Sequence, residues 1–159
     1  MMHLVRTTSE DLNFRALVKL LDHDLRARDG AEHAFYAPFN TVANLQHVVV
    51  AYHEAVPVGC GAFKPFTAER VEIKRMFVQP EHRGQGIARA VLTELEHWAQ
   101  ELHYAGYVLE TGQKQPEAIR LYQKSGYQRI PNYGPYVGVE NSVCMQKEGR
   151  ASAAVPQPG

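Results

Sequence analysis

Residues 83–88 read Arg-Gly-Gln-Gly-Ile-Ala, and they lie where a short apolar strand gives way to an amphipathic helix. The strand is predicted over residues 71–78, and Pro80 closes it. Glycine permits a tight turn and lets the backbone approach a ligand closely. A helix N-terminus adds unpaired N–H donors and the positive end of a dipole, so the hexapeptide predicts a phosphate or diphosphate site. In the helix, one apolar face repeats at steps of three and four residues: Ile87, Val91, Leu95, Trp98 and Leu102.

Two other phosphate-binding motifs are excluded at this turn. A dinucleotide-binding fingerprint needs a third small residue at position 89, where this chain has Arg89. A P-loop ends in Gly-Lys-Ser/Thr, and this sequence does not. Further along, a strand is predicted over residues 107–111, and a short helix over 116–125 with Pro116 in its first turn and Gly126 past its end.

These segments resemble the GNAT superfamily of acyl-CoA-dependent N-acetyltransferases. Arg83-x-x-Gly86-x-Ala88 is similar to its Arg/Gln-x-x-Gly-x-Gly/Ala signature, and residues 118–127, Ala-Ile-Arg-Leu-Tyr-Gln-Lys-Ser-Gly-Tyr, are similar to a second family segment. The resemblance covers residues 44–146 well and the first forty residues in outline. It implies an α/β fold whose mixed, mostly antiparallel sheet is flanked by helices. Its two central parallel strands, 71–78 and 107–111, are expected to splay apart around the acyl-CoA arm.

The remaining segments are consistent with several strands alternating with helices. A first strand is expected at residues 3–6, then a helix opened by a capping box of Thr8 and Asp11 and ended by Asp29-Gly30. A strand pair at 48–52 and 58–63 follows, and the last strand is expected at 137–145. The apolar stripe of the first helix is assigned to Leu12, Leu17, Leu20, Leu21 and Leu25. We expect one N-acetyltransferase domain over residues 1–148 and a disordered tail over 149–159.

Composition limits the partners. Seventeen acidic and 17 basic residues cancel, which disfavours nucleic acid and anionic membranes. No leader-like or membrane-spanning apolar run is found, so a cytoplasmic location is expected. Cys60 and Cys144 are interpreted as buried free thiols rather than a disulfide. The eight histidines show no metal-ligand spacing, so no metal is expected.

The resemblance implies direct attack of an amine on the thioester of acetyl-CoA, without an acyl-enzyme. A backbone N–H near Met76, Phe77 or Val78 would stabilise the oxyanion. The cosubstrate diphosphate would be held by the N–H groups of Arg83, Gly84, Gln85, Gly86, Ile87 and Ala88. The Arg83 side chain would add a positive charge beside it.

Two side chains are the candidate catalytic residues. Tyr122 matches a family tyrosine that acts as general acid at the thioester sulfur, although a tyrosine on a helix face can equally be packing. Glu72, on the strand that would line the cleft, is a candidate base or a group that orients a water. It can instead be a solvated carboxylate paired with Lys74. Glu110, on the second central strand, is the rival base.

Other positions are assigned by analogy. Gln115 would contact the pantetheine, where the family often has asparagine, and Lys124 and Arg120 would meet the 3′-phosphate of CoA. An aromatic group, Phe35, Tyr36, Tyr133 and Tyr136, would lie near the acceptor mouth or simply pack. Acidic residues that would suit a cationic amine, or be merely solvated, are Asp22, Asp24, Asp29 and Glu32.

The acceptor is expected to be a small-molecule or peptide amine, and the protein a monomer or homodimer. A longer acyl group than acetyl stays open. A non-catalytic acyl-CoA sensor is the alternative from another functional class. Retention of Tyr122 and of an acidic residue at Glu72 argues against the sensor.

Overall fold

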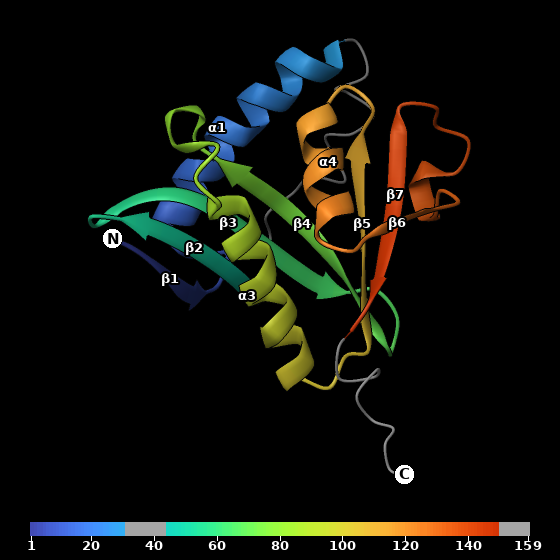
Figure 1. The fold of residues 1–159 in the computed structure, drawn as a ribbon, viewed down its shortest axis with the longest axis horizontal. Helices are drawn as coiled ribbons and strands as arrows, with labels where there is room; N and C mark the ends of the chain where they lie inside the picture. Colours follow the sequence, from blue (N-terminus) through green and yellow to red (C-terminus); the bar gives the residue numbers. More distant parts are fainter. Residues whose placement is uncertain (31–43, 150–159) are drawn as a thin grey trace. The chain divides into compact units, whose positions relative to one another are not determined.

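A computed structural model describes residues 1–30 and 44–149 of the chain (Figure 1). The chain forms two compact units, each built from two stretches of sequence. The first unit contains residues 1–64 and 74–95, and the second contains 65–73 and 96–159. Strand β4 (Arg70–Val78) and helix α3 (Ile87–Glu101) contribute to both units.

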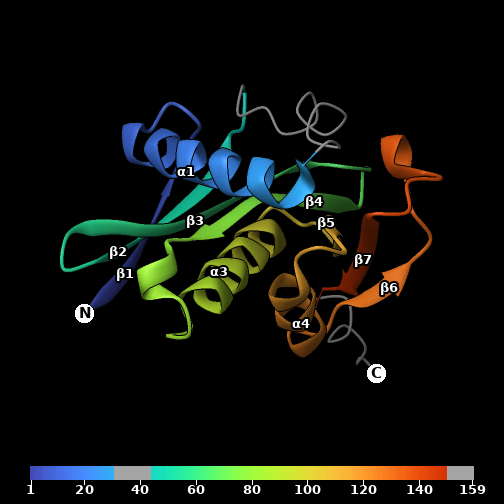
Figure 2. The same ribbon diagram turned by 90° about the horizontal axis from the view of Figure 1, so that it is seen from above.

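The first unit is built on three antiparallel strands. Its strands are β1 (Met2–Thr7), β2 (His47–His53) and β3 (Val56–Pro65). Val50 of β2 lies opposite Val5 of β1 on one side and opposite Cys60 of β3 on the other. Helix α1 (Leu12–Asp29) lies on one face of these strands and the start of α3 lies on the other (Figure 2). This confirms the predicted first strand, first helix and strand pair.

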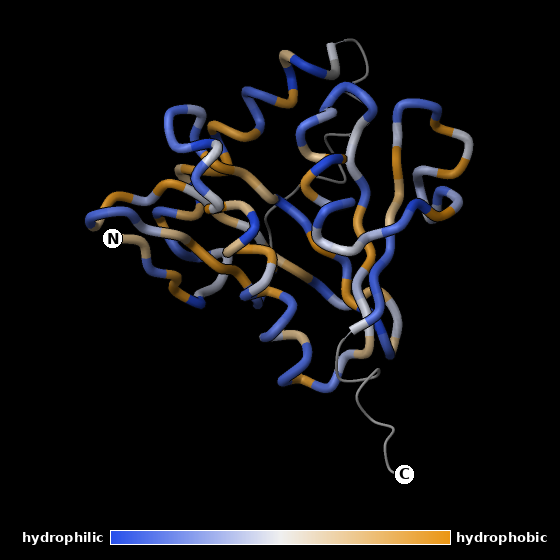
Figure 3. The backbone as a smooth tube through the Cα atoms, viewed as in Figure 1, coloured by the Kyte–Doolittle hydropathy of each residue, from blue (hydrophilic) through white to orange (hydrophobic). Residues whose placement is uncertain are grey.

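Helix α1 begins and packs differently from the prediction. Asp11, not Thr8, is the N-cap, because its carboxylate accepts a hydrogen bond from the Phe14 N–H at 2.9 Å. Leu12 is 80% exposed and Leu20 is also exposed, so both are wrongly placed in the apolar stripe. In Figure 3 the helix alternates between hydrophobic and hydrophilic segments along its length. The side chains that it buries against β2, β3 and β4 are Phe14, Leu17, Val18 and Leu21.

Helix α3 packs closely against β3 because β3 has glycine at the contact. A Cβ on Gly61 would lie 2.9 Å from the Leu95 side chain and 3.0 Å from that of Val91. The predicted stripe is wrong at its end, since Leu102 lies past the helix and is exposed. The buried residues of α3 are Ile87, Val91, Leu92, Leu95, Glu96 and Ala99.

The second unit contains the parallel pair. The first half of β4 pairs with β5 (Gly106–Gly112), from Arg70 opposite Gly106 to Ile73 opposite Leu109. Strand β7 (Ser142–Glu148) is antiparallel to β5, and β6 (Gln128–Ile130) is antiparallel to β7. Helix α4 (Pro116–Lys124) lies between β5 and β6 in the chain. The strand order β1-β2-β3-β4-β5-β7-β6, with one parallel pair, confirms the mixed, mostly antiparallel sheet.

The end of the chain departs from the prediction. The last strand was expected at 137–145 but begins only at Ser142, because residues 134–136 form a 3₁₀ turn. Strand β6 was not predicted. Gly149 is buried, and its N–H donates to the Ala105 carbonyl at 2.6 Å, so the predicted disordered tail does not begin there. The rest of that tail, 150–159, lies outside the described residues, and the single-domain assignment remains a prediction.

Cys60 and Cys144 are buried free thiols, as predicted. Within residues 1–30 and 44–149, no cluster of His, Cys, Asp and Glu side chains could hold a metal ion. No helix in this described part is long and apolar enough to cross a membrane.

Candidate functional site

The turn between β4 and α3 has the conformation that its glycines allow. Gly84 has φ 81° and Gly86 has φ 82°, the left-handed region that other residues rarely adopt. A Cβ at either position would meet no atom within 4 Å. Glycine is therefore required here by the backbone conformation and not by crowding. The open space above both residues leaves their backbone accessible to a ligand.

The N–H groups of this turn differ in availability. The Arg83 N–H donates to the Pro80 carbonyl at 3.3 Å, so it is already engaged within the turn. For the N–H groups of Gly84, Gln85 and Gly86, the described part of the chain offers no acceptor. The Gly86 carbonyl accepts the first bond of α3, from Ala90 at 3.0 Å. The N–H groups left for an anion lie from Gly84 into the first turn of α3.

The Arg83 side chain braces the turn. Its Nε donates to the Val78 carbonyl at 2.9 Å, and its guanidinium lies 5.7 Å from the Phe77 ring centre. A second nitrogen is 4.0 Å from the Asp24 carboxylate. These contacts link the end of β4 to the turn that follows it. Arg83 thus positions the loop, and its role as a positive charge beside a diphosphate remains a prediction.

A backbone irregularity precedes the predicted oxyanion donors. Arg75 has φ 60°, which is rare for a residue with a side chain, and it is 5% exposed. Its guanidinium forms an ion pair with Asp22 of α1, and its carbonyl accepts a bond from the Cys60 thiol at 3.5 Å. Burial raises the pKa of that thiol to about 12. The three predicted donors follow directly after this bend: Met76, Phe77 and Val78.

The acidic residues of α1 are not a free acidic mouth. Asp22 pairs with Arg75, and Asp24 pairs with Arg28 at 3.3 Å as well as lying near Arg83. Their charges are paired within the first unit, and their attraction for a cationic acceptor remains a prediction. The Asp29 side chain and Glu32 lie outside the described residues.

In the second unit, both candidate bases lie on one face of the sheet. Glu72 is opposite Val108 on β5, and Glu110 is two residues further along β5. Because side chains alternate along a strand, Glu72, Val108 and Glu110 point to the same side. Cys144 on β7 is opposite Glu110 and shares this face. Burial, and then the charges of Glu110 and Glu72, raise the pKa of Cys144 to about 11, and nearby hydrogen bonding and Arg129 partly oppose this.

Glu72 has a specific partner that the sequence did not indicate. It is 6% exposed, and its Oε2 accepts a hydrogen bond from the Tyr133 hydroxyl at 2.9 Å. Desolvation by burial and then the Glu72 charge hold the pKa of Tyr133 well above its usual value, so this hydroxyl stays protonated. Glu72 is therefore buried and bonded to Tyr133, so it is not the solvated carboxylate of the alternative prediction.

Tyr122 is buried in α4 at 6% exposure, and its ring lies edge-on to that of Tyr127 at 5.8 Å. Burial, with a smaller contribution from Glu110, raises the pKa of Tyr122. The phenol is therefore a neutral donor at physiological pH, as a general acid must be. The contact with Tyr127 also gives Tyr122 the packing role that was its alternative.

The other predicted site residues are scattered. Gln115 is the residue before α4, and its N–H donates to the Gly112 carbonyl at 3.0 Å. Lys124 and Arg120 are exposed on α4. Tyr136 is buried beside Tyr133. Two predicted acceptor-mouth residues, Phe35 and Tyr36, lie outside the described residues.

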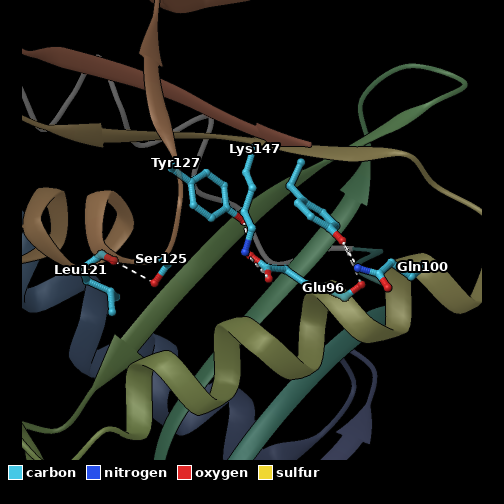
Figure 4. Close-up of polar contacts among 7 residues, drawn as sticks. Glu96, Gln100, Leu121, Ser125, Tyr127 and Lys147 are labelled. Carbon is cyan, nitrogen blue, oxygen red and sulfur yellow. Dashed lines mark hydrogen bonds and ion pairs between the residues drawn. The ribbon is translucent and has the colours of Figure 1, made fainter. Parts of the chain in front are cut away.

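A second phenol–carboxylate pair lies at the end of α3 (Figure 4). Glu96 is buried on the apolar stripe, and its carboxylate accepts from the Tyr127 hydroxyl at 2.8 Å and from Lys147 Nζ at 2.9 Å. Gln100 donates to the Tyr107 hydroxyl at 2.7 Å. These side chains fasten α3 to β5 and β7, and each of these buried polar groups has a partner.

Comparison with known proteins agrees with this architecture. The model of the Acetyltransferase (GNAT) family matches residues 14–127. An IAA acetyltransferase of Azospirillum brasilense is 39% identical over 100 residues, which are 62% of this chain and 65% of that protein's length. The chain thus spans just under two thirds of this relative, and only about a third of several mammalian N-acetyltransferases that it also matches.

Solved structures match nearly the whole chain. A Klebsiella pneumoniae protein described as a candidate acyl-CoA N-acyltransferase is 30% identical, with a TM-score of 0.77 and coverage of 93% of this chain and 97% of that one. A GNAT family acetyltransferase of Elizabethkingia anophelis, solved with acetyl-CoA bound, has a TM-score of 0.65 at 19% identity, covering 92% and 97%. Its likeness concerns the fold alone. With most of its length matched by the family model and by a relative of 30% identity, this chain belongs to the acetyltransferase (GNAT) family.

Proposed function

We propose that the protein transfers the acetyl group of acetyl-CoA to a primary amine, by direct attack of the amine on the thioester. The observation that carries the proposal is the turn at 84–86, where two left-handed glycines leave successive N–H groups without an acceptor in the described chain, directly before a helix N-terminus. That arrangement suits a diphosphate. Family membership supports it, as do the name of the Azospirillum relative and the acetyl-CoA in the Elizabethkingia structure.

The proposed reaction needs three groups from the chain. Glu72 takes a proton from the incoming ammonium, and the free amine forms a C–N bond at the thioester carbonyl. A backbone N–H of Met76, Phe77 or Val78 stabilises the oxyanion. When the C–S bond breaks, the CoA sulfur leaves beside the Tyr122 phenol. The products are an N-acetyl amine and CoA, and no acyl-enzyme forms.

The chemistry of Tyr122 limits how it can act. An ordinary thiol has a pKa of about 8.5 and an ordinary phenol one of about 10. Burial raises the pKa of Tyr122 further, so complete transfer of its proton to the thiolate is uphill. We therefore expect Tyr122 to stabilise the departing sulfur by a hydrogen bond, with the net proton coming from the amine.

Two variants distinguish Glu72 from Glu110 as the base. Glu72→Gln should lower kcat/KM most at neutral pH, and the defect should shrink at higher pH, where more of the amine arrives already neutral. Glu110→Gln lies on the same face and serves as the matched comparison. If only Glu110→Gln loses kcat/KM across the pH range, the base is Glu110 on β5. If neither variant loses kcat/KM, a water chain removes the proton instead.

The function itself is tested by CoA release from acetyl-CoA over a panel of small-molecule and peptide amines. We expect turnover with at least one amine and none without amine. Binding of acetyl-CoA with no turnover on any amine would favour the acyl-CoA sensor. If CoA is released faster from a longer acyl-CoA than from acetyl-CoA, the transferred group is that longer acyl group and not acetyl.

A further inference from the structure

We propose that Tyr133 is a positioning residue, whose hydroxyl holds the Glu72 carboxylate in the orientation that receives the proton of the acceptor amine. The inference rests on the proposed function and adds a residue to it. It starts from the 2.9 Å bond between the Tyr133 hydroxyl and Glu72 Oε2, which joins β4 to a loop 61 residues further along the chain.

The loop that carries Tyr133 is fastened by its own hydrogen bonds. The Asn132 side-chain amide donates to the carbonyls of Tyr136 and Val139, both at 3.0 Å. The Tyr136 N–H donates to the Tyr133 carbonyl at 3.0 Å, closing the 3₁₀ turn Gly134–Tyr136. The asparagine that precedes Tyr133 is thus bonded to the last residue of the turn and to Val139 beyond it, and this restrains the backbone from which the Tyr133 side chain projects.

Two aromatic rings fix the Tyr133 side chain in turn. Phe66 lies 4.7 Å from it, centre to centre, at a tilt of 58°, and Tyr136 lies edge-on at 5.9 Å. Such ring pairs limit rotation of a side chain that already has few rotamers. The hydroxyl is consequently aimed at Glu72 by packing, and the hydrogen bond is made without ordering a free side chain.

A fixed partner matters for a carboxylate base. The terminal torsion of glutamate is broad, so an isolated carboxylate samples many planes. A bond to Oε2 from a phenol that stays protonated removes that freedom and leaves the charge on Glu72. Other titratable groups that act on this cluster are Glu110 on β5, Cys144 on β7, Arg129 on β6 and Tyr136 in the turn.

The chain supplies a matched control. Tyr127 donates to buried Glu96 at 2.8 Å, so it makes the same phenol–carboxylate bond in the same unit, to a carboxylate with no proposed chemical role. Tyr127→Phe and Tyr133→Phe each remove one hydroxyl and keep the ring. Both should lower the thermal unfolding midpoint. Only Tyr133→Phe should lower kcat, because only its carboxylate is the proposed base.

The test is a double-mutant cycle on an amine identified in the panel. Tyr133→Phe should lower kcat about tenfold or more and leave KM for acetyl-CoA within about twofold. In a Glu72→Gln background the same change should alter kcat by less than about twofold, because Tyr133 acts through Glu72. Losses that multiply in full would overturn the proposal, as would a Tyr127→Phe protein that loses as much kcat.

Two further outcomes are distinguishable. If Tyr133→Phe does not fold, Asn132→Ala loosens the turn without touching either partner, and it should show the same dependence on Glu72; a loss that persists in Glu72→Gln would overturn the positioning role. Wild-type protein that acetylates no amine overturns the proposed function together with this inference. Turnover with independent losses overturns the inference alone.

Discussion

Replacing Gly86 by alanine separates the backbone role of the turn from its ligand role. The residue has φ 82°, and an added Cβ would meet nothing within 4 Å, so the cost to folding comes from the left-handed backbone alone. That cost is about 1–2 kcal/mol for a residue with a Cβ. For a domain of this size, it corresponds to a fall in Tm of about 2–8 °C. The variant should therefore fold.

Binding should suffer more than folding. The new methyl group, and any shift of the turn that relieves its strain, would disturb N–H groups from Gly84 into α3. Losing one hydrogen bond to a charged diphosphate costs about 1.5–3 kcal/mol, or roughly a 10- to 150-fold rise in Kd. Isothermal titration with CoA measures this directly, well below the melting temperature of the variant.

Gly138 is the control for this experiment. It has φ 80° and likewise no atom within 4 Å of an added Cβ, but it lies in the loop before β7. Gly138→Ala should lose comparable stability and keep its affinity for CoA. If Gly86→Ala binds CoA about as tightly as wild type while its Tm falls as in Gly138→Ala, the diphosphate is held elsewhere and the reasoning is refuted.

Three other perturbations test single contacts. Tyr122→Phe should lower kcat about ten- to a thousandfold with little change in the Kd for acetyl-CoA, and an unchanged kcat would leave Tyr122 as packing. Asp22→Asn leaves the buried Arg75 guanidinium without its carboxylate partner. Since Asp22 is 43% exposed, the free energy of unfolding in urea should fall by about 1–3 kcal/mol. The control Asp24→Asn should lose well under about 1 kcal/mol. The fold raises the pKa of Cys60 from 9.0 to about 12. The thiol's contribution to the free energy of unfolding is therefore complete below pH 9 and falls by about 1.4 kcal/mol per pH unit as pH rises toward 12. An equal alkaline slope in the unfolding free energy of Cys60→Ala would contradict this.

The sequence could predict the features that depend on local spacing. In the strand and the helix that flank the turn at 83–88, apolar residues recur with the period of each element. Gly84 and Gly86 supply the left-handed conformation of the turn, which few other residues can adopt. The antiparallel β2–β3 hairpin follows from its short connection and β-branched runs, whereas the pairing of β1 with β2 spans helix α1.

The contacts that complete the site depend on long-range packing. Nothing near Glu72 in the sequence indicates Tyr133, and nothing near Asp22 indicates Arg75; only the folded chain brings each pair together. One signal was available: Gly134-Pro135 is a turn signature. It argues against a strand near residue 137 and for a compact loop that presents the neighbouring tyrosines.

The interleaving of the two units has a consequence for synthesis of the chain. The antiparallel strands β1 to β3 are complete once residue 65 has emerged from the ribosome, so their pairing can begin at once. The edge of β4 that faces β5 cannot pair until β5 emerges, and the opposite edge of β5 must wait for β7, which ends at Glu148. Residues 70–73, with Glu72 among them, therefore lack their β5 partners until residues 106–109 have been synthesised. We expect the pairs of β7 with β5 and β6 to form last, because β7 is the last of the described strands to be synthesised and contacts between distant segments close slowly.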